Sequence, residues 1–148
     1  MSWFGMSSWT LVVPLLAAFL TGCSSAPPPL IPRESADNLG MILAAYTEAF
    51  QKLQRPPNSM SELKPFLQKL GAPDTVLVSP HDGQPYEIHW GVDPLESVSG
   101  SDPTVPQSPF IAYDRTGVDG IRYVATGMGV FRMSDQEFEQ ARKLAKKR

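Results

Sequence analysis

Cysteine and histidine are nearly missing from this chain. Among its 148 residues there is one cysteine, Cys23, and there are two histidines, His81 and His89. A single cysteine excludes an intramolecular disulfide. It also excludes the zinc sites that combine several cysteines with histidines. The stability of the fold must therefore come from an ordinary hydrophobic core.

An excess of one charge is also lacking. The chain has 13 basic and 15 acidic residues and a formal net charge of −2. Proteins that bind nucleic acid are usually strongly basic, because their side chains neutralise phosphate groups. The charge balance therefore excludes nucleic acid as the expected partner.

The N-terminal hydrophobic run is too short to cross a bilayer. Residues 11–20 form an uncharged run of 10 residues, whereas a membrane-spanning helix needs about 20. A run of this length is typical of a signal peptide. Leu20, Thr21, Gly22 and Cys23 follow it and resemble the bacterial lipobox, in which two small residues precede the modified cysteine. No Lys or Arg precedes Cys23, which departs from the positively charged start of most signal peptides.

The lipobox resemblance implies an exported lipoprotein. Residues 1–22 would be removed, and lipid attached to the thiol of Cys23 would hold the protein on a membrane. Residues 23–34 contain four prolines and are expected to form an extended tether. Ser24 stands where an Asp signals inner-membrane retention in Gram-negative bacteria. Because Ser24 is not an Asp, placement on the periplasmic face of the outer membrane is favoured in such an envelope.

Residues 35–148 show the periodicities of a single α+β domain. Apolar residues three or four positions apart predict a helix over residues 35–54, and a capping-box pattern at Ser59–Glu62 predicts a second helix that Gly71 ends. Both are expected to pack on an antiparallel sheet of four to five strands. A capping box at Ser134–Glu137 predicts a C-terminal helix. The expected strands are residues 75–78, 86–90, 110–113, 121–125 and 130–132.

Three stretches resemble the globular domain of type II secretion major pseudopilins. Residues 57–63 are similar to the Pro-Thr-rich entry before the family's second helical segment. Residues 79–88 are similar to its Asp-Pro-Trp-Gly-Asn-Pro-Tyr turn, and residues 110–120 are similar to its closing strand and Asp-Gly turn. The similarity covers residues 39–120. The long apolar helix that packs pseudopilins into a filament is missing, and prolines interrupt the corresponding region. The resemblance therefore implies a pseudopilin-like domain on a tether and not a pilus subunit.

Side chains suited to catalysis are sparse. His81 beside Asp82 offers half of a general-base pair, but a turn of this composition is more often structural. No Gly-x-Ser-x-Gly elbow, phosphate-binding loop or His-Glu-x-x-His pair occurs in the sequence. We therefore expect no enzymatic activity, and we assign no catalytic, cofactor-binding or metal-binding residues.

Calcium is the one metal that the pseudopilin resemblance suggests. In that family a loop before the last strands holds the ion through oxygen ligands, and carboxylates border comparable loops here. No EF-hand spacing occurs, so these carboxylates are expected to be solvated turn residues. They are Asp93, Glu96, Asp102, Asp114 and Asp119.

Three functional hypotheses remain after these exclusions. The leading one is a non-catalytic lipoprotein that docks onto another protein of the envelope, in secretion or surface assembly, through a sheet edge or the loop 91–108. The second is a lipoprotein that binds a ligand in a pocket lined by Trp90 and Tyr113. The third is a hydrolase that uses His81 and Asp82.

The lipid anchor can be tested at Cys23. Lipidation requires the thiol, so Cys23→Ala should abolish the incorporation of labelled palmitate and move the protein out of the membrane fraction. The Ser24→Ala variant keeps the thiol and should retain both properties. Unchanged labelling of the Cys23→Ala protein would overturn the lipoprotein assignment.

Overall fold

Three helices and a four-stranded antiparallel sheet make up the α+β fold expected from the sequence. The computed structural model describes residues 33–72, 74–97 and 108–145. The predicted signal peptide, the lipobox, Cys23 and the tether up to residue 32 lie outside these ranges. The elements are α1 (Arg33–Leu53), α2 (Met60–Lys69), the 3-10 helix η1 (Asp74–Leu77), β1 (Glu87–Ile88), β2 (Phe110–Tyr113), β3 (Ile121–Thr126), β4 (Gly129–Ser134) and α3 (Asp135–Ala145).

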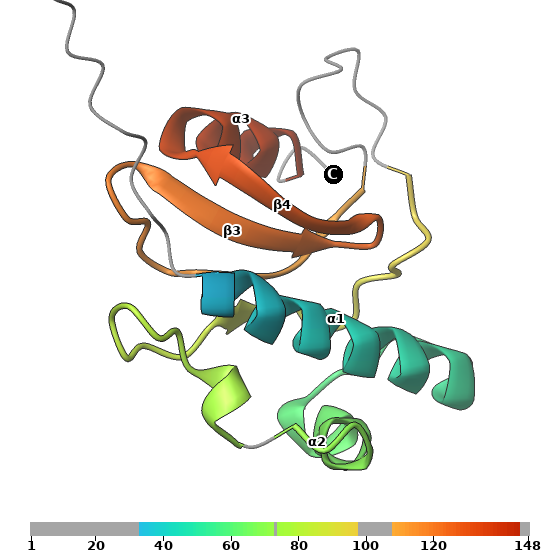
Figure 1. Ribbon diagram of the computed structural model, residues 1–148. Helices are drawn as coiled ribbons and strands as arrows, with labels where there is room; N and C mark the ends of the chain where they lie inside the picture. Colours follow the sequence, from blue (N-terminus) through green and yellow to red (C-terminus); the bar gives the residue numbers. More distant parts are fainter. Residues whose placement is uncertain (1–32, 73, 98–107, 146–148) are drawn as a thin grey trace, which may run out of the picture.

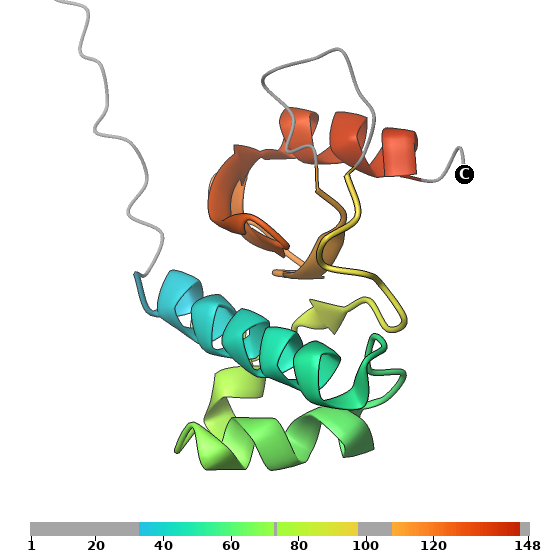
Figure 2. The same ribbon diagram turned by 90° about the vertical axis from the view of Figure 1, so that its right-hand side faces the viewer.

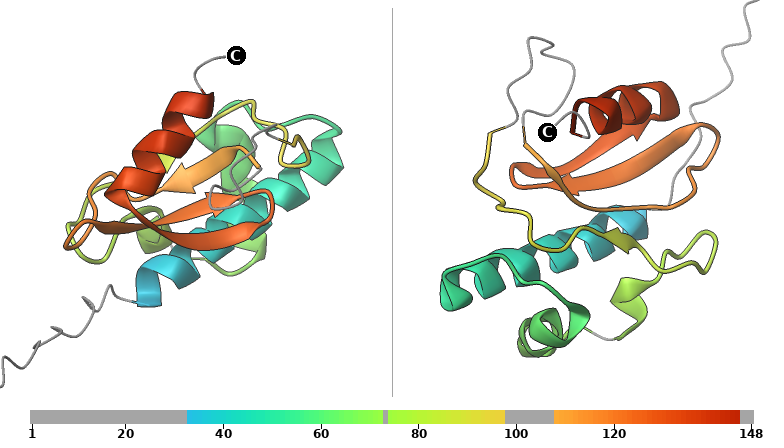
Figure 3. Two further views of the ribbon diagram at one scale, coloured as in Figure 1. Left: turned by 90° about the horizontal axis from the view of Figure 1, so that it is seen from above. Right: turned by 180° about the vertical axis from the view of Figure 1, so that it is seen from behind.

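The sheet lies between helices on both of its faces. Its strands follow the order β1-β2-β3-β4, so each strand pairs with its neighbour in sequence. Figures 1 and 2 show α1 under one face, with α2 packed on the far side of α1, and α3 on the opposite face. Seen from above, α3 lies across the sheet (Figure 3). Within the described residues, no helix combines the length and the apolar character needed to cross a membrane.

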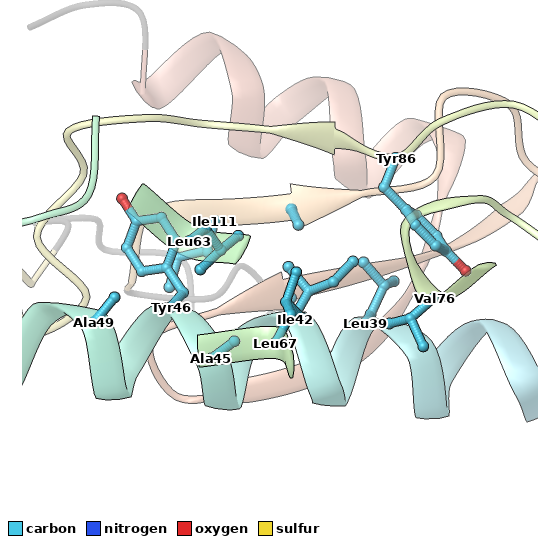
Figure 4. Close-up of a cluster of buried hydrophobic side chains, with 12 residues drawn as sticks. Leu39, Ile42, Ala45, Tyr46, Ala49, Leu63, Leu67, Val76, Tyr86 and Ile111 are labelled. Carbon is cyan, nitrogen blue, oxygen red and sulfur yellow. The ribbon is translucent and has the colours of Figure 1, made fainter. Parts of the chain in front are cut away.

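Each face of the sheet has its own hydrophobic cluster. Neighbouring residues of a strand point to opposite faces, and on β3 Ala125 belongs to the α1 side while Val124 belongs to the α3 side. The cluster on the α3 side consists of Phe110, Val124, Met133, Phe138 and Ala141. The larger cluster on the α1 side is drawn in Figure 4 and includes Leu39, Ile42, Tyr46, Leu63, Leu67, Val76, Tyr86 and Ile111.

The buried face of α1 differs from the predicted stripe in its last turn. Leu39, Ile42 and Tyr46 are fully buried as expected, but Phe50 is only partly buried and Leu53 is exposed. The last turn of α1 extends beyond the sheet in Figure 1, so apolar side chains there have less to pack against. The helix also begins at Arg33, two residues before the predicted start at residue 35.

Helix α2 is confirmed, but its first turn is not capped as predicted. Ser59 is the N-cap residue, yet its side chain makes no capping hydrogen bond. Glu62 instead accepts from the backbone N–H of Asn58 (2.9 Å) and pairs with the Arg55 guanidinium (2.8 Å). The predicted stop at Gly71 is confirmed by its left-handed backbone (φ 69°). The helix ends in a Schellman motif, with Gly71 N–H bonded to Gln68 O and Ala72 N–H to Leu67 O, each at 3.0 Å.

The strand predicted over residues 75–78 is wrong. Residues 74–77 form the 3-10 helix η1, whose one buried side chain is Val76. A ladder would need a continuous partner strand, but Val78 makes only an isolated bridge with Pro85. The bridge is flanked by hydrogen bonds from Ser79 N–H to Gln84 O (2.8 Å) and from Tyr86 N–H to Leu77 O (3.1 Å), but it is not continued into a ladder. The strand predicted over residues 86–90 is shortened to β1, the two residues that pair with β2.

The C-terminal half follows the sequence prediction closely. Strands β2, β3 and β4 occupy the expected positions, although β3 and β4 are longer than predicted. Asp119 and Gly120 both have positive φ, as the predicted hairpin turn requires. The second capping box is confirmed: Ser134 N–H donates to Glu137 Oε2 (2.7 Å), and Glu137 N–H donates to Ser134 Oγ (3.2 Å). Phe138 and Ala141 of α3 are buried as expected.

The packing of α1 predicts different consequences at two adjacent positions. Ile42 is completely buried, whereas Met41 is exposed. Truncating a buried Ile to Ala removes transfer free energy and leaves a cavity, at a cost of about 2–5 kcal/mol. The Ile42→Ala variant should therefore lose that much unfolding free energy in urea titration, while Met41→Ala should change it little. Equal losses would show that the buried face of α1 is wrongly placed.

Candidate functional site

Two turns that are distant in sequence bring five polar side chains together. We call them the His81 cluster: Ser79, His81, Asp82, Asp114 and Thr116. The first turn is closed by hydrogen bonds from Ser79 N–H to Gln84 O (2.8 Å) and from Gly83 N–H to Ser79 O (2.9 Å). Asp82 Oδ1 accepts from the Gln84 N–H (2.9 Å). In the second turn, Asp114 directly follows β2, and its N–H donates to Tyr123 O on β3 (3.3 Å).

The His81 imidazole is mostly buried, and both of its nitrogens have neighbours. Nδ1 lies 2.6 Å from Ser79 Oγ and 3.8 Å from Asp114 Oδ1. Nε2 lies 3.5 Å from Asp82 Oδ2 and 3.4 Å from Thr116 Oγ1. The Thr116 hydroxyl also donates to Asp82. The ring thus connects the two turns.

The two carboxylates of the cluster have opposite pKa shifts. Asp114 is 1% exposed, and this burial raises its pKa; the nearby Ser79 hydroxyl and His81 ring lower it only in part. For Asp82, burial also tends to raise the pKa, but hydrogen bonds from Thr116 and the Gln84 N–H outweigh it, so the pKa is lowered. Asp82 is therefore stabilised as an anion, whereas the charge of Asp114 is only partly compensated.

The pair predicted from the sequence, His81 and Asp82, is in contact. The polar side chains around it contact one another and join the two turns. The nearest hydroxyl to His81, that of Ser79, belongs to a residue that is 2% exposed. The two carboxylates face opposite nitrogens of the ring and do not converge on a common point. Within the described ranges, no group of three or more His, Cys, Asp or Glu side chains is arranged to hold a metal ion.

The carboxylates considered for calcium have separate positions in the fold. Asp93 accepts from the Leu95 N–H (2.8 Å) and thereby closes a local turn. Asp119 is exposed in the turn before β3. Asp114 belongs to the His81 cluster. Glu96 has interactions of its own, and Asp102 lies outside the described residues.

Trp90 and Tyr113 do not form the pocket suggested by the sequence. Trp90 packs against the cluster on the α1 side, and Tyr113 packs against the cluster on the α3 side. The sheet therefore separates them. His89, which the alternation places on the solvent side of its strand, is half-buried and stacks edge-on against Tyr113 at 5.3 Å between ring centroids. Its burial lowers its pKa.

A groove that sequence reasoning missed lies between α1 and the segment 75–80. It is open to solvent, has a volume of about 460 Å³, and is lined by Glu34, Asn38, Met41, Val76, Val78 and Ser79 among others. Three buried oxygens in this part of the fold, Ser35 Oγ, Tyr86 Oη and Asp114 Oδ1, make no hydrogen bond of standard geometry, although Ser35 lies close enough to Tyr86 to lower its pKa, and Ser79 lies close enough to Asp114 to do the same. The sequence gives no signal for this groove, because its residues come from two segments that are distant in sequence.

No protein-family model matches the chain, and no curated protein or solved structure gives a significant match.

The raised pKa of Asp114 predicts a pH-dependent effect of its removal. A folded-state pKa above the unfolded value means that protonation of Asp114 favours the folded state, and this contribution is lost as the pH rises through the folded pKa. The Asp114→Asn variant has no ionisable side chain at position 114. Its melting temperature relative to the parent should therefore rise between pH 4 and pH 8. The opposite slope would show that the fold stabilises the Asp114 anion.

Proposed function

We propose that this chain is a membrane-anchored envelope lipoprotein whose domain docks onto another protein and performs no catalytic step. The lipobox-like residues Leu20–Cys23 support the anchor, and the prolines after them support a tether. The pseudopilin resemblance suggests secretion or surface-assembly machinery as the class of partner.

The observation that carries this proposal is a set of exposed apolar side chains on the β3–β4 hairpin and on the segment that runs against its turn. We call Leu95, Met128 and Phe131 the hairpin patch; they are 75%, 71% and 36% exposed. A Cβ atom placed on Gly127 would lie 1.7 Å from Pro94 O, so the segment carrying Leu95 runs directly against the turn carrying Met128. Single exposed apolar residues are common, but grouped ones are typical of interaction sites.

The hairpin patch adjoins the loop predicted to mediate docking. That loop, residues 91–108, begins with the segment that carries Pro94 and Leu95, while residues 98–107 lie outside the described residues. The close approach at Gly127 explains why this position is glycine, since any side chain would collide with the Pro94 carbonyl. The backbone thus presents Leu95 and Met128 from two segments on one rigid support.

The hydrolase alternative gains no support from the His81 cluster, whose side chains contact one another across two turns. The ligand-binding alternative has a different basis from the one expected, because the groove beside α1 replaces the pocket suggested at Trp90 and Tyr113. The groove and the hairpin patch share no residue, so a domain with one docking surface can also carry the other site.

The docking surface can be tested by photo-crosslinking in intact cells. A photoreactive residue at position 128 should form a discrete adduct with an envelope protein, because Met128 projects from the patch. The same residue at position 70 serves as a matched control, since Leu70 is an apolar side chain on α2 and is 46% exposed. Adding Leu95→Ser should reduce the adduct at position 128 without lowering the melting temperature.

Two results would contradict the docking proposal. Equal adducts from positions 128 and 70 would indicate that contact is non-specific. An adduct at position 128 that persists unchanged with Leu95→Ser and Phe131→Ser would show that the patch does not determine binding.

A further inference from the structure

The charges of this chain are distributed unevenly along its length. Residues 142–148, which begin in the last turn of α3, hold five of the 13 basic residues and none of the 15 acidic ones. We call them the basic segment. The rest of the chain has 8 basic and 15 acidic residues and therefore a net charge of −7. A block of about five or more like charges is typical of a segment that binds a surface of opposite charge.

The dipole of α3 accounts for only part of the basic segment. Asp135 and Glu137 lie in the first turn of α3, and Arg142 and Lys143 lie in its last turn, an order that complements the dipole. The C-terminal end of a helix is equivalent to roughly half a negative charge, and its effect falls off within one turn. Residues 146–148 are all basic and follow the described part of α3. Five positive charges thus exceed what the helix end requires.

The described part of the basic segment is open to solvent. Phe138 and Ala141 form the buried face of α3, while Lys143 is exposed. Arg142 pairs with Glu139 (3.3 Å), and these two side chains are 42% and 50% exposed. An exposed pair of this kind contributes little stability, so Arg142 can exchange it for another anion at small cost.

The basic segment and the tether leave the domain on different sides. Figure 2 shows the end of α3 on the opposite side of the molecule from the start of α1, where the predicted tether joins the domain. If residues 23–32 are extended at about 3.1 Å per residue, they reach about 31 Å. A domain of about 100 residues has a radius of gyration of roughly 13 Å. The tether is therefore long enough for the end of α3 to meet the membrane that holds Cys23.

We propose that the basic segment binds the anionic phospholipid surface of the membrane that carries the lipid anchor. This inference rests on the anchor in the proposed function and is independent of the hairpin patch. Phospholipid headgroups present many phosphate oxygens without fixed positions, which suits lysine, a compact charge on a flexible stem. The same surface repels the net charge of −7 on the rest of the chain, so both effects turn the end of α3 towards the membrane. A basic segment is a common second membrane signal beside a lipid anchor.

Vesicle sedimentation tests the basic segment separately from the anchor. Residues 24–148 contain every described element and both hydrophobic clusters, but lack the thiol of Cys23. This protein should sediment with vesicles that contain anionic phosphatidylglycerol and remain in solution with vesicles of phosphatidylcholine alone. Salt should release it, because the screening length falls from about 10 Å at 0.1 M to about 3 Å at 1 M. Palmitate labelling at Cys23 tests the anchor, so either of the two claims can fail alone.

Two triple variants remove the same charge from different places, because the lysines divide equally between the basic segment and the first two helices. The first variant changes the basic segment: Lys143→Gln, Lys146→Gln and Lys147→Gln. The matched control changes α1 and α2: Lys52→Gln, Lys64→Gln and Lys69→Gln. The first should bind the anionic vesicles about 100-fold more weakly, at about fivefold for each basic residue near the surface. The control should bind as the parent does, and both should keep the parent's melting temperature.

Three results would overturn the proposal. An equal loss of affinity in the two variants would show that net charge governs binding and that the basic segment does not. Equal binding to the two kinds of vesicle would show that anionic headgroups are not recognised. Absence of binding to either kind would leave the basic segment as a solvated helix end or as a contact for an acidic protein.

Discussion

Burial of one face of α1 is the interaction on which the rest of this structure depends. The helix lies between the sheet on one side and α2 with η1 on the other, and Leu39, Ile42 and Tyr46 are completely buried there. The Tyr46 hydroxyl accepts from the Val92 N–H (3.1 Å) and lies 3.2 Å from His89 O, which fixes the chain after β1 against the helix. Because the core occupies this face, it is closed to contacts with other molecules.

Local sequence signals predicted those parts of the fold that local interactions determine. The capping box at Ser134 and the stop at Gly71 need only residues within a few positions, and both are confirmed. One local signal failed, because Ser59 does not cap α2 and Glu62 pairs with Arg55 instead. The other failures involve distant partners. Residues 75–78 have the composition of a strand but lack a continuous partner beyond Pro85. Phe50 fits the helical period but is only partly buried, in the last turn of α1.

The same distinction applies to the candidate site. The contact between His81 and Asp82 could be predicted because the residues are adjacent, whereas Asp114 and Thr116 join them only through pairing of β1 with β2. The opposite pKa shifts of Asp82 and Asp114 follow from that tertiary arrangement. The surroundings of the Tyr86 hydroxyl, near Ser35 and Ser79, were equally hidden, because an aromatic residue in an alternating segment predicts core packing and gives no sign of what its oxygen meets.

Native-state hydrogen exchange tests the role of α1 most directly. Amides that exchange only through global unfolding report the most stable part of a fold. If α1 organises the structure, the amides of Ile42 and Tyr46 should exchange with the same free energy as that of Ala125 on β3, and this value should equal the unfolding free energy from denaturant titration. Exchange of the α1 amides at a clearly lower free energy, with the sheet still protected, would contradict this account.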